Sequence, residues 1–402
     1  SLEYDLETGD KRSLPLKSNT FCSSGSFLGD GTLLSTENFS DGFSSLRTIQ
    51  PCQDKKCQWT EKPKGMTTNR WYSTSTTLSD GTVFILGGSN QSIAVNEADF
   101  NNPTFEFFPK NKKKPGPQHF QFLVDTLPFN LYPIVHLLPG PKDQTHLFIF
   151  ANQDSIIYDW TTNKVVKKLP QLPGGPRSYP LTGTSVMLPL RPEDNYKAQI
   201  LVCGGNTEMD VNHEATNSCG KIDLSSDNPT WEVDDFGGFK RVMPDGVLLA
   251  DGKVLFLNGA GTGIAGYTRK GNILQADNAV LTAVLYDDNK PLGQRFSKQD
   301  TSKIPRVYHS VATLLPNGKV FVAGSSPQAS IVTKNVKFPT DPSYLSSNAP
   351  RGTITSVKNS SDINQKPIKV SYGETVEVTV ELSDESQKFT AAVVHYGELA
   401  EF

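Results

Sequence analysis

Residues 304–324, IPRVYHSVATLLPNGKVFVAG, contain two apolar strands joined by the turn Asn317–Gly318. An Asn-Gly or Asp-Gly pair between apolar runs is the strongest short-range signal for a β-hairpin. The same pattern recurs in three other segments: FLGDGTLLST (27–36), LSDGTVFILGG (78–88) and LLADGKVLFLNG (248–259). Two hairpins with longer loops are predicted in HLLPGPKDQTHLFIFA (136–151) and VMLPLRPEDNYKAQILVCGG (186–205). Six such units, roughly 50 to 65 residues apart and each followed by more strand-like sequence, predict a β-propeller with four strands per blade.

The composition agrees with an all-β chain. The 402 residues include 32 glycines and 27 prolines, and short apolar runs recur where long helical periodicities are absent. The net charge is −3, and apart from the lysine-rich run 110–114 the charges are scattered, so no surface for nucleic acid or for a membrane is indicated. No apolar window approaches the roughly 20 residues that would span a bilayer.

The hairpin turns also provide a register for comparing the blades. Counting eight residues back from Asp30, Asp80, Asp251 and Asn317, and from the looser turn at Gly140, leads to Cys22, Tyr72, Met243, His309 and Tyr132. Because the first strand of each blade lines the propeller axis, we expect Cys22, Tyr72 and His309 to meet near one mouth of the channel. Tyr308 would face the opposite side of a regular strand, so a bulge or a strand end is needed to aim both Tyr308 and His309 inward. Three other residues are interpreted as packed structural side chains: Tyr132, Tyr179 and Met243.

Five motifs in order along nearly the whole chain resemble those of the galactose oxidase and glyoxal oxidase family of copper radical oxidases, especially its plant members. They are NTFCSSGS (19–26), NRWYSTSTTLSDGTVFILGG (69–88), RSYPLTGTSVMLPL (177–190), ILVCGG (200–205) and IPRVYHSVATLLPNGKVFVAGS (304–325). The resemblance implies a seven-bladed kelch-type propeller over residues 1–345 and an immunoglobulin-like β-sandwich over residues 346–402. It also implies copper as the cofactor.

In that family a cysteine is joined by a thioether bond to a tyrosine that binds copper and carries a radical, and the matching residues are Cys22 and Tyr72. Sulfur on the ring donates electron density, so the phenolate loses an electron more easily. Tyr308 matches the axial tyrosine that accepts the substrate's hydroxyl proton, and His309 matches an equatorial histidine, a ligand type that suits copper. The resemblance therefore predicts Cys22, Tyr72 and Tyr308 as catalytic residues and Tyr72, Tyr308 and His309 as copper ligands.

Both ends of the chain depart from the family pattern. Residues 1–14, SLEYDLETGDKRSL, resemble the outer strands of a blade whose inner hairpin lies upstream in relatives, so one of the seven blades is expected to be incomplete. The C-terminal sandwich is also expected to be partial, because relatives continue through further strands. The family's second histidine ligand corresponds to Glu401, whereas His395 is interpreted as an ordinary strand histidine. We therefore expect the chain to be a fragment truncated at both ends.

Two further departures concern the surroundings of Tyr72. Galactose oxidases carry a tryptophan eighteen residues after the cross-linked tyrosine, where this chain has Asn90. Trp71 is interpreted as packing on the outer face, because adjacent strand residues point to opposite sides. Glu37 and Asn38 bring side chains to a place where relatives have a glycine pair.

The five cysteines suggest an oxidising compartment. Cys52 and Cys57 lie in one short loop, and Cys203 and Cys219 flank a predicted hairpin, so two local disulfides would leave Cys22 unpaired. Disulfides favour a secreted protein of the extracellular space or cell wall. Three N-glycosylation sequons agree with this: Asn38, Asn90 and Asn359.

Three functions remain compatible with these patterns. The first is a secreted copper radical oxidase, a monomer that oxidises glyoxal-like aldehydes or primary alcohols and reduces O₂ to H₂O₂. The second is a catalytically degenerate propeller that serves as an extracellular carbohydrate- or protein-binding module, which a genuine Glu401 in the full-length protein would favour. The third, an intracellular kelch-type adaptor, is disfavoured by the predicted disulfides and sequons.

Overall fold

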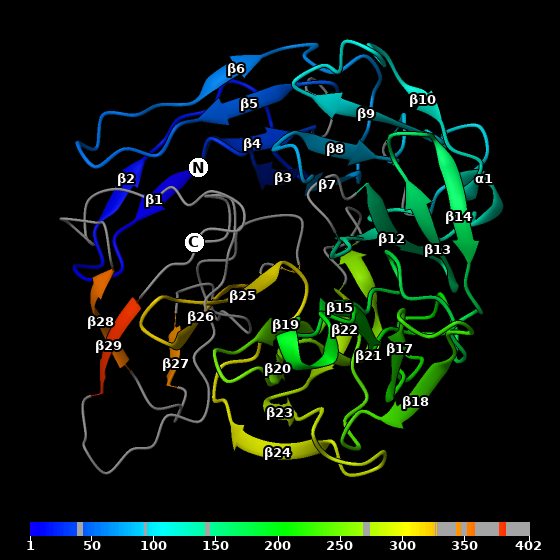
Figure 1. The fold of residues 1–402 in the computed structure, drawn as a ribbon, viewed down its shortest axis with the longest axis vertical. Helices are drawn as coiled ribbons and strands as arrows, with labels where there is room; N and C mark the ends of the chain where they lie inside the picture. Colours follow the sequence, from blue (N-terminus) through cyan, green and yellow to red (C-terminus); the bar gives the residue numbers. More distant parts are fainter. Residues whose placement is uncertain are drawn as a thin grey trace.

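The computed structural model describes residues 1–37, 43–91, 95–140, 145–267, 274–325, 327, 343–346, 352–357 and 378–382. In this part of the chain, antiparallel sheets are arranged around a central axis (Figure 1). Helical structure in these residues is confined to α1 (Phe122–Asp125) and a short 3-10 turn (Pro192–Asp194). The predicted all-β propeller is confirmed.

Five of the described sheets have four strands, and each is one blade. The first blade consists of β3 (Ser24–Phe27), β4 (Leu33–Thr36), β5 (Leu46–Ile49) and β6 (Thr60–Lys62). The second consists of β7 (Thr74–Thr77), β8 (Val83–Leu86), β9 (Thr104–Phe108) and β10 (Gln118–His119). The third consists of β11 (Ile134–Leu137), β12 (His146–Ala151), β13 (Asp154–Asp159) and β14 (Lys164–Lys168). The fourth consists of β15 (Thr184–Met187), β16 (Gln199–Cys203), β17 (Ser218–Asp223) and β18 (Trp231–Asp235).

The fifth blade consists of β19 (Asp245–Leu248), β20 (Val254–Leu257), β23 (Thr282–Tyr286) and β24 (Phe296–Thr301), and it is interrupted by the ribbon β21 (Ala260–Tyr267) and β22 (Leu274–Ala279). The sixth sheet has three described strands: β25 (Ser310–Leu314), β26 (Lys319–Gly324) and β27 (Ser343–Ser346). Two strand pairs complete the description: β1 (Leu2–Tyr4) with β2 (Lys11–Ser13), and β28 (Gly352–Val357) with β29 (Val378–Leu382). The proposed division at residues 345 and 346 and the C-terminal sandwich remain predictions.

The six predicted hairpins all form between the first and second strands of a blade. In the four tight ones the strands close in equivalent registers: Phe27 opposite Leu33, Thr77 opposite Val83, Leu248 opposite Val254 and Leu314 opposite Val320. Gly81 has a φ of 78°, in the left-handed region that glycine adopts without steric cost, so the turn requires it. The first strands β3, β7, β15, β19 and β25 lie nearest the axis, and β6, β14, β18 and β24 lie at the rim (Figure 1).

Neighbouring blades are held together by apolar side chains on both faces of their second strands. On β8, Val83 and Ile85 pack in a cluster shared with the first blade, whereas Phe84 and Leu86 pack in one shared with the third. The alternation follows the two-residue period of a strand. The strand is buried on both faces, which explains why its sequence, VFIL, is a continuous apolar run.

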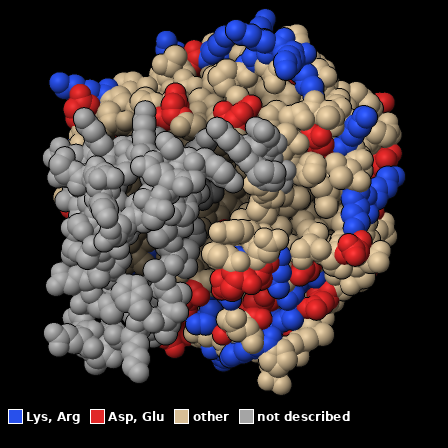
Figure 2. Space-filling model, viewed as in Figure 1, with Lys and Arg blue, Asp and Glu red and all other residues tan. Residues whose placement is uncertain are grey.

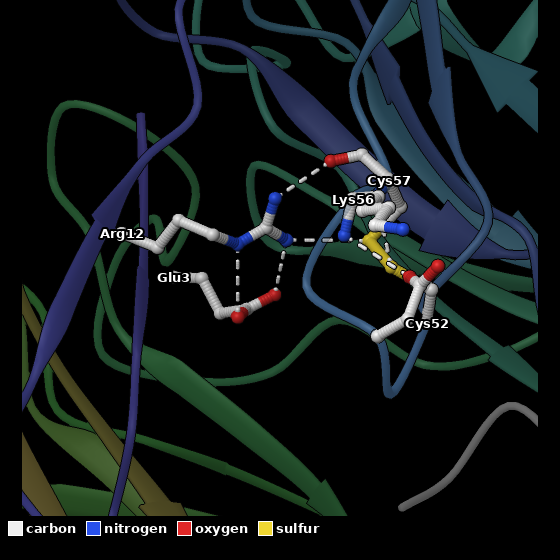
Figure 3. The surroundings of a disulfide bond; sticks show 6 residues. Glu3, Arg12, Cys52, Lys56 and Cys57 are labelled. Carbon is white, nitrogen blue, oxygen red and sulfur yellow. Dashed lines mark hydrogen bonds and ion pairs between the residues drawn. A yellow bond between two sulfur atoms is a disulfide. The ribbon is translucent and has the colours of Figure 1, made fainter.

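The N-terminal strand pair lies between the sixth sheet and the first blade. The Tyr4 ring on β1 is 6.1 Å from that of Phe321 on β26. On β2, the Arg12 guanidinium binds the Glu3 carboxylate at 2.7 Å and donates to the Cys57 carbonyl at 2.8 Å, beside the Cys52–Cys57 disulfide (Figure 3). This is the position predicted for the outer strands of an incomplete seventh blade.

The predicted disulfides are present. Cys52 is bonded to Cys57, and Cys203 to Cys219, which are directly paired across β16 and β17. Cys22 is a free thiol. On the face viewed in Figure 2, acidic and basic side chains are interspersed over the lower and right-hand parts of the described surface.

Candidate active site

The residues that lead into the inner strands adopt an unusual backbone conformation. All five positions found with the hairpin register have a positive φ: Cys22 (60°), Tyr72 (65°), Tyr132 (47°), Met243 (57°) and His309 (67°). This left-handed conformation costs a residue other than glycine about 1–2 kcal/mol. A left-handed residue interrupts the strand, in which successive side chains point to opposite faces. Two consecutive side chains can then both face the axis. Tyr308 and His309 accordingly line the same cavity, just before β25 begins at Ser310.

Buried arginines hold several of these strained segments in place. Arg70, Arg177, Arg241 and Arg306 lie two residues before Tyr72, Tyr179, Met243 and Tyr308, and each is at most 3% exposed. Arg241 shows the pattern, because it donates hydrogen bonds to the carbonyls of Asn258 at 3.0 Å and Thr282 at 2.7 Å, which connects the start of the fifth blade to its later strands. Arg70 makes the same kind of contacts with Gly87 and Thr104, and also binds the Glu106 carboxylate at 2.8 Å. The interaction energy of these contacts offsets the strain of the left-handed residues.

A cavity of about 430 Å³ lies where the inner strands of the blades converge. Its described lining includes Cys22, Tyr132, Tyr179, Met243, Tyr308 and His309. Asp245 is the one carboxylate among the described lining residues, and none of them is Lys or Arg. The cavity therefore combines phenol, thiol and imidazole groups with small apolar side chains.

Cys22 lies against two of the predicted ligand tyrosines. Side-chain hydrogen bonds join it to Tyr72 and to Tyr308. Burial raises the pKa of the Cys22 thiol to about 12, so the thiol is protonated at neutral pH and inert by itself.

Aromatic rings pack around Tyr72, which is 3% exposed. Trp71 lies with its ring centroid 4.1 Å from that of Tyr72 and an interplanar angle of 32°. Tyr179 stacks at 4.5 Å and 26°, and Tyr132 approaches edge-on at 5.1 Å. The Tyr72 hydroxyl donates a hydrogen bond of 3.1 Å to the Tyr179 hydroxyl.

Comparison with known proteins agrees with this geometry. A family model described as the glyoxal oxidase N-terminus matches residues 1–348. The chain belongs to the glyoxal oxidase family of copper radical oxidases. Its sequence is 39% identical over 401 residues to an aldehyde oxidase of Vitis pseudoreticulata, which covers 95% of this chain and 70% of that protein. It is 35% identical over 405 residues to an aldehyde oxidase of Arabidopsis thaliana, with coverage of 96% and 62%.

A solved structure confirms the fold of this glyoxal oxidase family member. A fungal alcohol oxidase of the AA5 family, in complex with copper, superimposes with a TM-score of 0.60 at 19% sequence identity, over 88% of this chain and 71% of that one. Among the described residues, no helix is long and apolar enough to cross a membrane.

One interpretation of an aromatic residue needs correction. Trp71 does not pack on the outer face, because the left-handed residue after it breaks the strand alternation on which that prediction rested. Tyr179, interpreted from the sequence as a packed structural side chain, is 6% exposed and accepts a hydrogen bond from Tyr72, and it also lines the cavity. A signal for Tyr179 was present in the sequence, because Arg177-Ser178-Tyr179 repeats the Arg-X-Tyr spacing that also precedes Tyr72 and Tyr308.

Glu37 is a fully buried carboxyl group directly after β4, whose last residue, Thr36, pairs with Ser24. Its Oε2 accepts a hydrogen bond of 3.0 Å from the Ser73 amide, next to Tyr72, while its Oε1 has no hydrogen-bond partner among the described residues. Burial raises the pKa of Glu37 well above its usual range. The side chain is therefore accommodated as a neutral acid that supports the turn at Tyr72.

The donor groups of this site fit copper. Burial raises the pKa values of Tyr72 and Tyr308 well above the usual range for a phenol, so neither ionises alone at neutral pH. A divalent cation beside the two oxygens would lower both pKa values, and the imidazole of His309 is a ligand that copper favours. The expected place of a second histidine ligand, Glu401, and His395 lie outside the described residues.

Of the three asparagines in predicted sequons, Asn90 is among the described residues. Asn90 is exposed, and its backbone amide donates to the Phe100 carbonyl at 2.7 Å. Asn38 and Asn359 lie outside the described residues. Glycosylation at all three remains a prediction.

Proposed function

We propose that this chain is part of a secreted oxidase that converts simple aldehydes or primary alcohols to their oxidised products while O₂ is reduced to H₂O₂. The observation that carries the proposal is that Cys22, Tyr308 and His309 line one cavity although they come from the first and sixth blades, and that Tyr72 of the second blade is hydrogen-bonded to Cys22. The reaction is balanced, because a primary alcohol loses two hydrogen atoms to give an aldehyde, or a hydrated aldehyde loses two to give an acid, and O₂ accepts both.

In this proposal Tyr72, Tyr308 and His309 hold copper. When bound, copper supplies one of the two electron changes and favours the ionised form of the phenols. The Cys22 sulfur, once bonded to the Tyr72 ring, donates electron density to it, so Tyr72 can supply the other electron change. Tyr308 accepts the substrate's hydroxyl proton at its Oη, a role that a phenol performs only as a phenolate.

The cavity favours small substrates without a negative charge. Its volume is about 430 Å³, and Ala265, Val307 and Val311 contribute apolar wall. With Asp245 in the described lining and no Lys or Arg there, an anionic group would meet no positively charged side chain. Aldehydes are the preferred class within this proposal, because the relatives with the highest identity quoted above are named aldehyde oxidases. The two disulfides and the exposed Asn90 support secretion.

Mass spectrometry of protein purified in air and treated with copper tests the proposal. We expect a linked peptide containing Cys22 and Tyr72 that is two hydrogens lighter than its parts, together with peroxide release from small aldehydes. Cys22→Ser is the matched control, because it removes the sulfur and keeps a side chain of similar size. A folded, copper-loaded protein without the linked peptide would contradict the proposal and favour the carbohydrate- or protein-binding module.

A further inference from the structure

Tyr179 contacts both tyrosines to which the proposed function assigns copper. Its side chain is 6% exposed, and its ring stacks on that of Tyr72 at 4.5 Å. Trp71 lies against the same ring with centroids 4.1 Å apart and an interplanar angle of 32°. The Tyr72 ring is therefore packed against both Trp71 and Tyr179. The stacking fixes the position of the Tyr179 hydroxyl relative to the Tyr72 oxygen.

The Tyr179 hydroxyl is a shared hydrogen-bond partner. The Tyr72 hydroxyl donates to it over 3.1 Å, and a second side-chain hydrogen bond joins it to Tyr308. A phenol has one donor hydrogen and two acceptor lone pairs, so Tyr179 can accept from one neighbour and donate to the other. When the Tyr72 oxygen has lost its proton it can only accept, so any hydrogen bond between the two is then donated by Tyr179.

We propose that Tyr179 is a positioning residue whose hydroxyl, by donating a hydrogen bond to the Tyr72 oxygen, raises the reduction potential of Tyr72. The inference rests on the proposed function, in which Tyr72 is oxidised by one electron. A hydrogen bond donated to a negatively charged oxygen is stronger than one donated to a neutral oxygen. It therefore stabilises the reduced phenolate more than the neutral radical that remains after oxidation. One electron leaves Tyr72, and Tyr179 keeps its proton throughout.

The variant Tyr179→Phe separates the hydrogen bond from the stacking, because it keeps the ring and removes the hydroxyl. Copper-treated, cross-linked protein would be titrated with the ferricyanide–ferrocyanide couple, which takes up or supplies the electron, while the absorbance of oxidised Tyr72 is followed. We expect the variant to be oxidised more easily, with the equilibrium constant shifted by about tenfold, which corresponds to about 59 mV for one electron.

Tyr132→Phe is the matched control for the measured reduction potential of Tyr72. It also loses a hydroxyl from a ring in contact with Tyr72, but that hydroxyl donates to the Cys22 carbonyl at 2.8 Å and not to the Tyr72 oxygen. The potential of Tyr72 should be unchanged in this variant. An equal shift in both variants would indicate a general packing effect and overturn the inference.

The same samples distinguish failure of this inference from failure of the proposed function. If the linked peptide is present but Tyr179→Phe leaves the potential unchanged, the inference alone is wrong. If the wild-type protein forms no linked peptide, both are wrong. Should circular dichroism show that Tyr179→Phe does not fold, Tyr179→Met provides a flexible apolar side chain that also lacks a donor, and the absence of the shift there overturns the inference.

Discussion

Glu37→Gln is expected to change how the stability of the protein depends on pH. The native carboxyl is fully buried and has a pKa raised well above the value of 4.5 that an exposed glutamate would have. At pH values between 4.5 and the raised pKa, the folded protein therefore keeps a proton that the unfolded chain has lost. The free energy of unfolding of the wild type consequently falls as pH rises through this window. Glutamine does not titrate, and its side-chain oxygen can still accept the hydrogen bond from the Ser73 amide.

The magnitude follows from proton linkage. A difference of one bound proton changes the free energy of unfolding by at most about 1.4 kcal/mol per pH unit. Relative to Glu37→Gln, the wild type should lose up to about 3 kcal/mol between pH 5 and pH 7. Urea unfolding followed by tryptophan fluorescence at several pH values measures this difference, provided that the denaturant dependence is the same in both proteins.

Glu106→Gln is the matched control. Glu106 is also buried near Arg70, but it binds that arginine at 2.8 Å, and this partner and the Thr67 amide lower its pKa against the opposing effect of burial. The stability that comes from the lowered pKa of Glu106 is lost only as pH falls below 4.5. Between pH 5 and pH 7 the free energy of unfolding of this variant should therefore differ from that of the wild type by a constant amount. A wild type whose stability runs parallel to that of Glu37→Gln over the same range would refute the argument that Glu37 is protonated in the folded state.

Three other predictions use different measurements. Phe105→Ala removes a fully buried ring that contacts Phe84, Phe107 and Tyr158, and it should lower the free energy of unfolding by about 3–5 kcal/mol in urea, whereas a loss below 1 kcal/mol would mean that the second and third blades repack. Thiol titration of denatured, unreduced protein should find one reactive thiol, Cys22, before copper treatment and none afterwards; a thiol that persists would argue against the thioether. Burial raises the pKa of Asp245 to about 6, so the KM for glyoxylate relative to glyoxal should rise severalfold as pH increases through 6, because the carboxylate of the substrate then meets a second negative charge. Asp245→Asn should abolish that rise, and a rise that survives in this variant would exclude Asp245 as its cause.

The blades could be predicted from the sequence because a hairpin is specified locally. An Asp-Gly or Asn-Gly turn favours one backbone conformation, and the two-residue period of each strand sets the register of its partner. Counting back from these turns was enough to find Cys22, Tyr72 and His309, together with Tyr132 and Met243, and all five share the left-handed conformation. The roles of Cys22, Tyr72, Tyr308 and His309 required the family motifs, since geometry alone does not distinguish a ligand from a packed aromatic residue.

Only the tertiary structure decided which side chains surround Tyr72. Trp71 turns toward it because a left-handed residue breaks the strand alternation, and Tyr179 reaches it from the segment that leads into the fourth blade. Glu37 is buried beside it, where a protonated carboxyl can stay without an ion pair. These contacts join residues up to 107 positions apart, so they depend on how the blades close around the axis. No local pattern of turns or alternating residues contains that information.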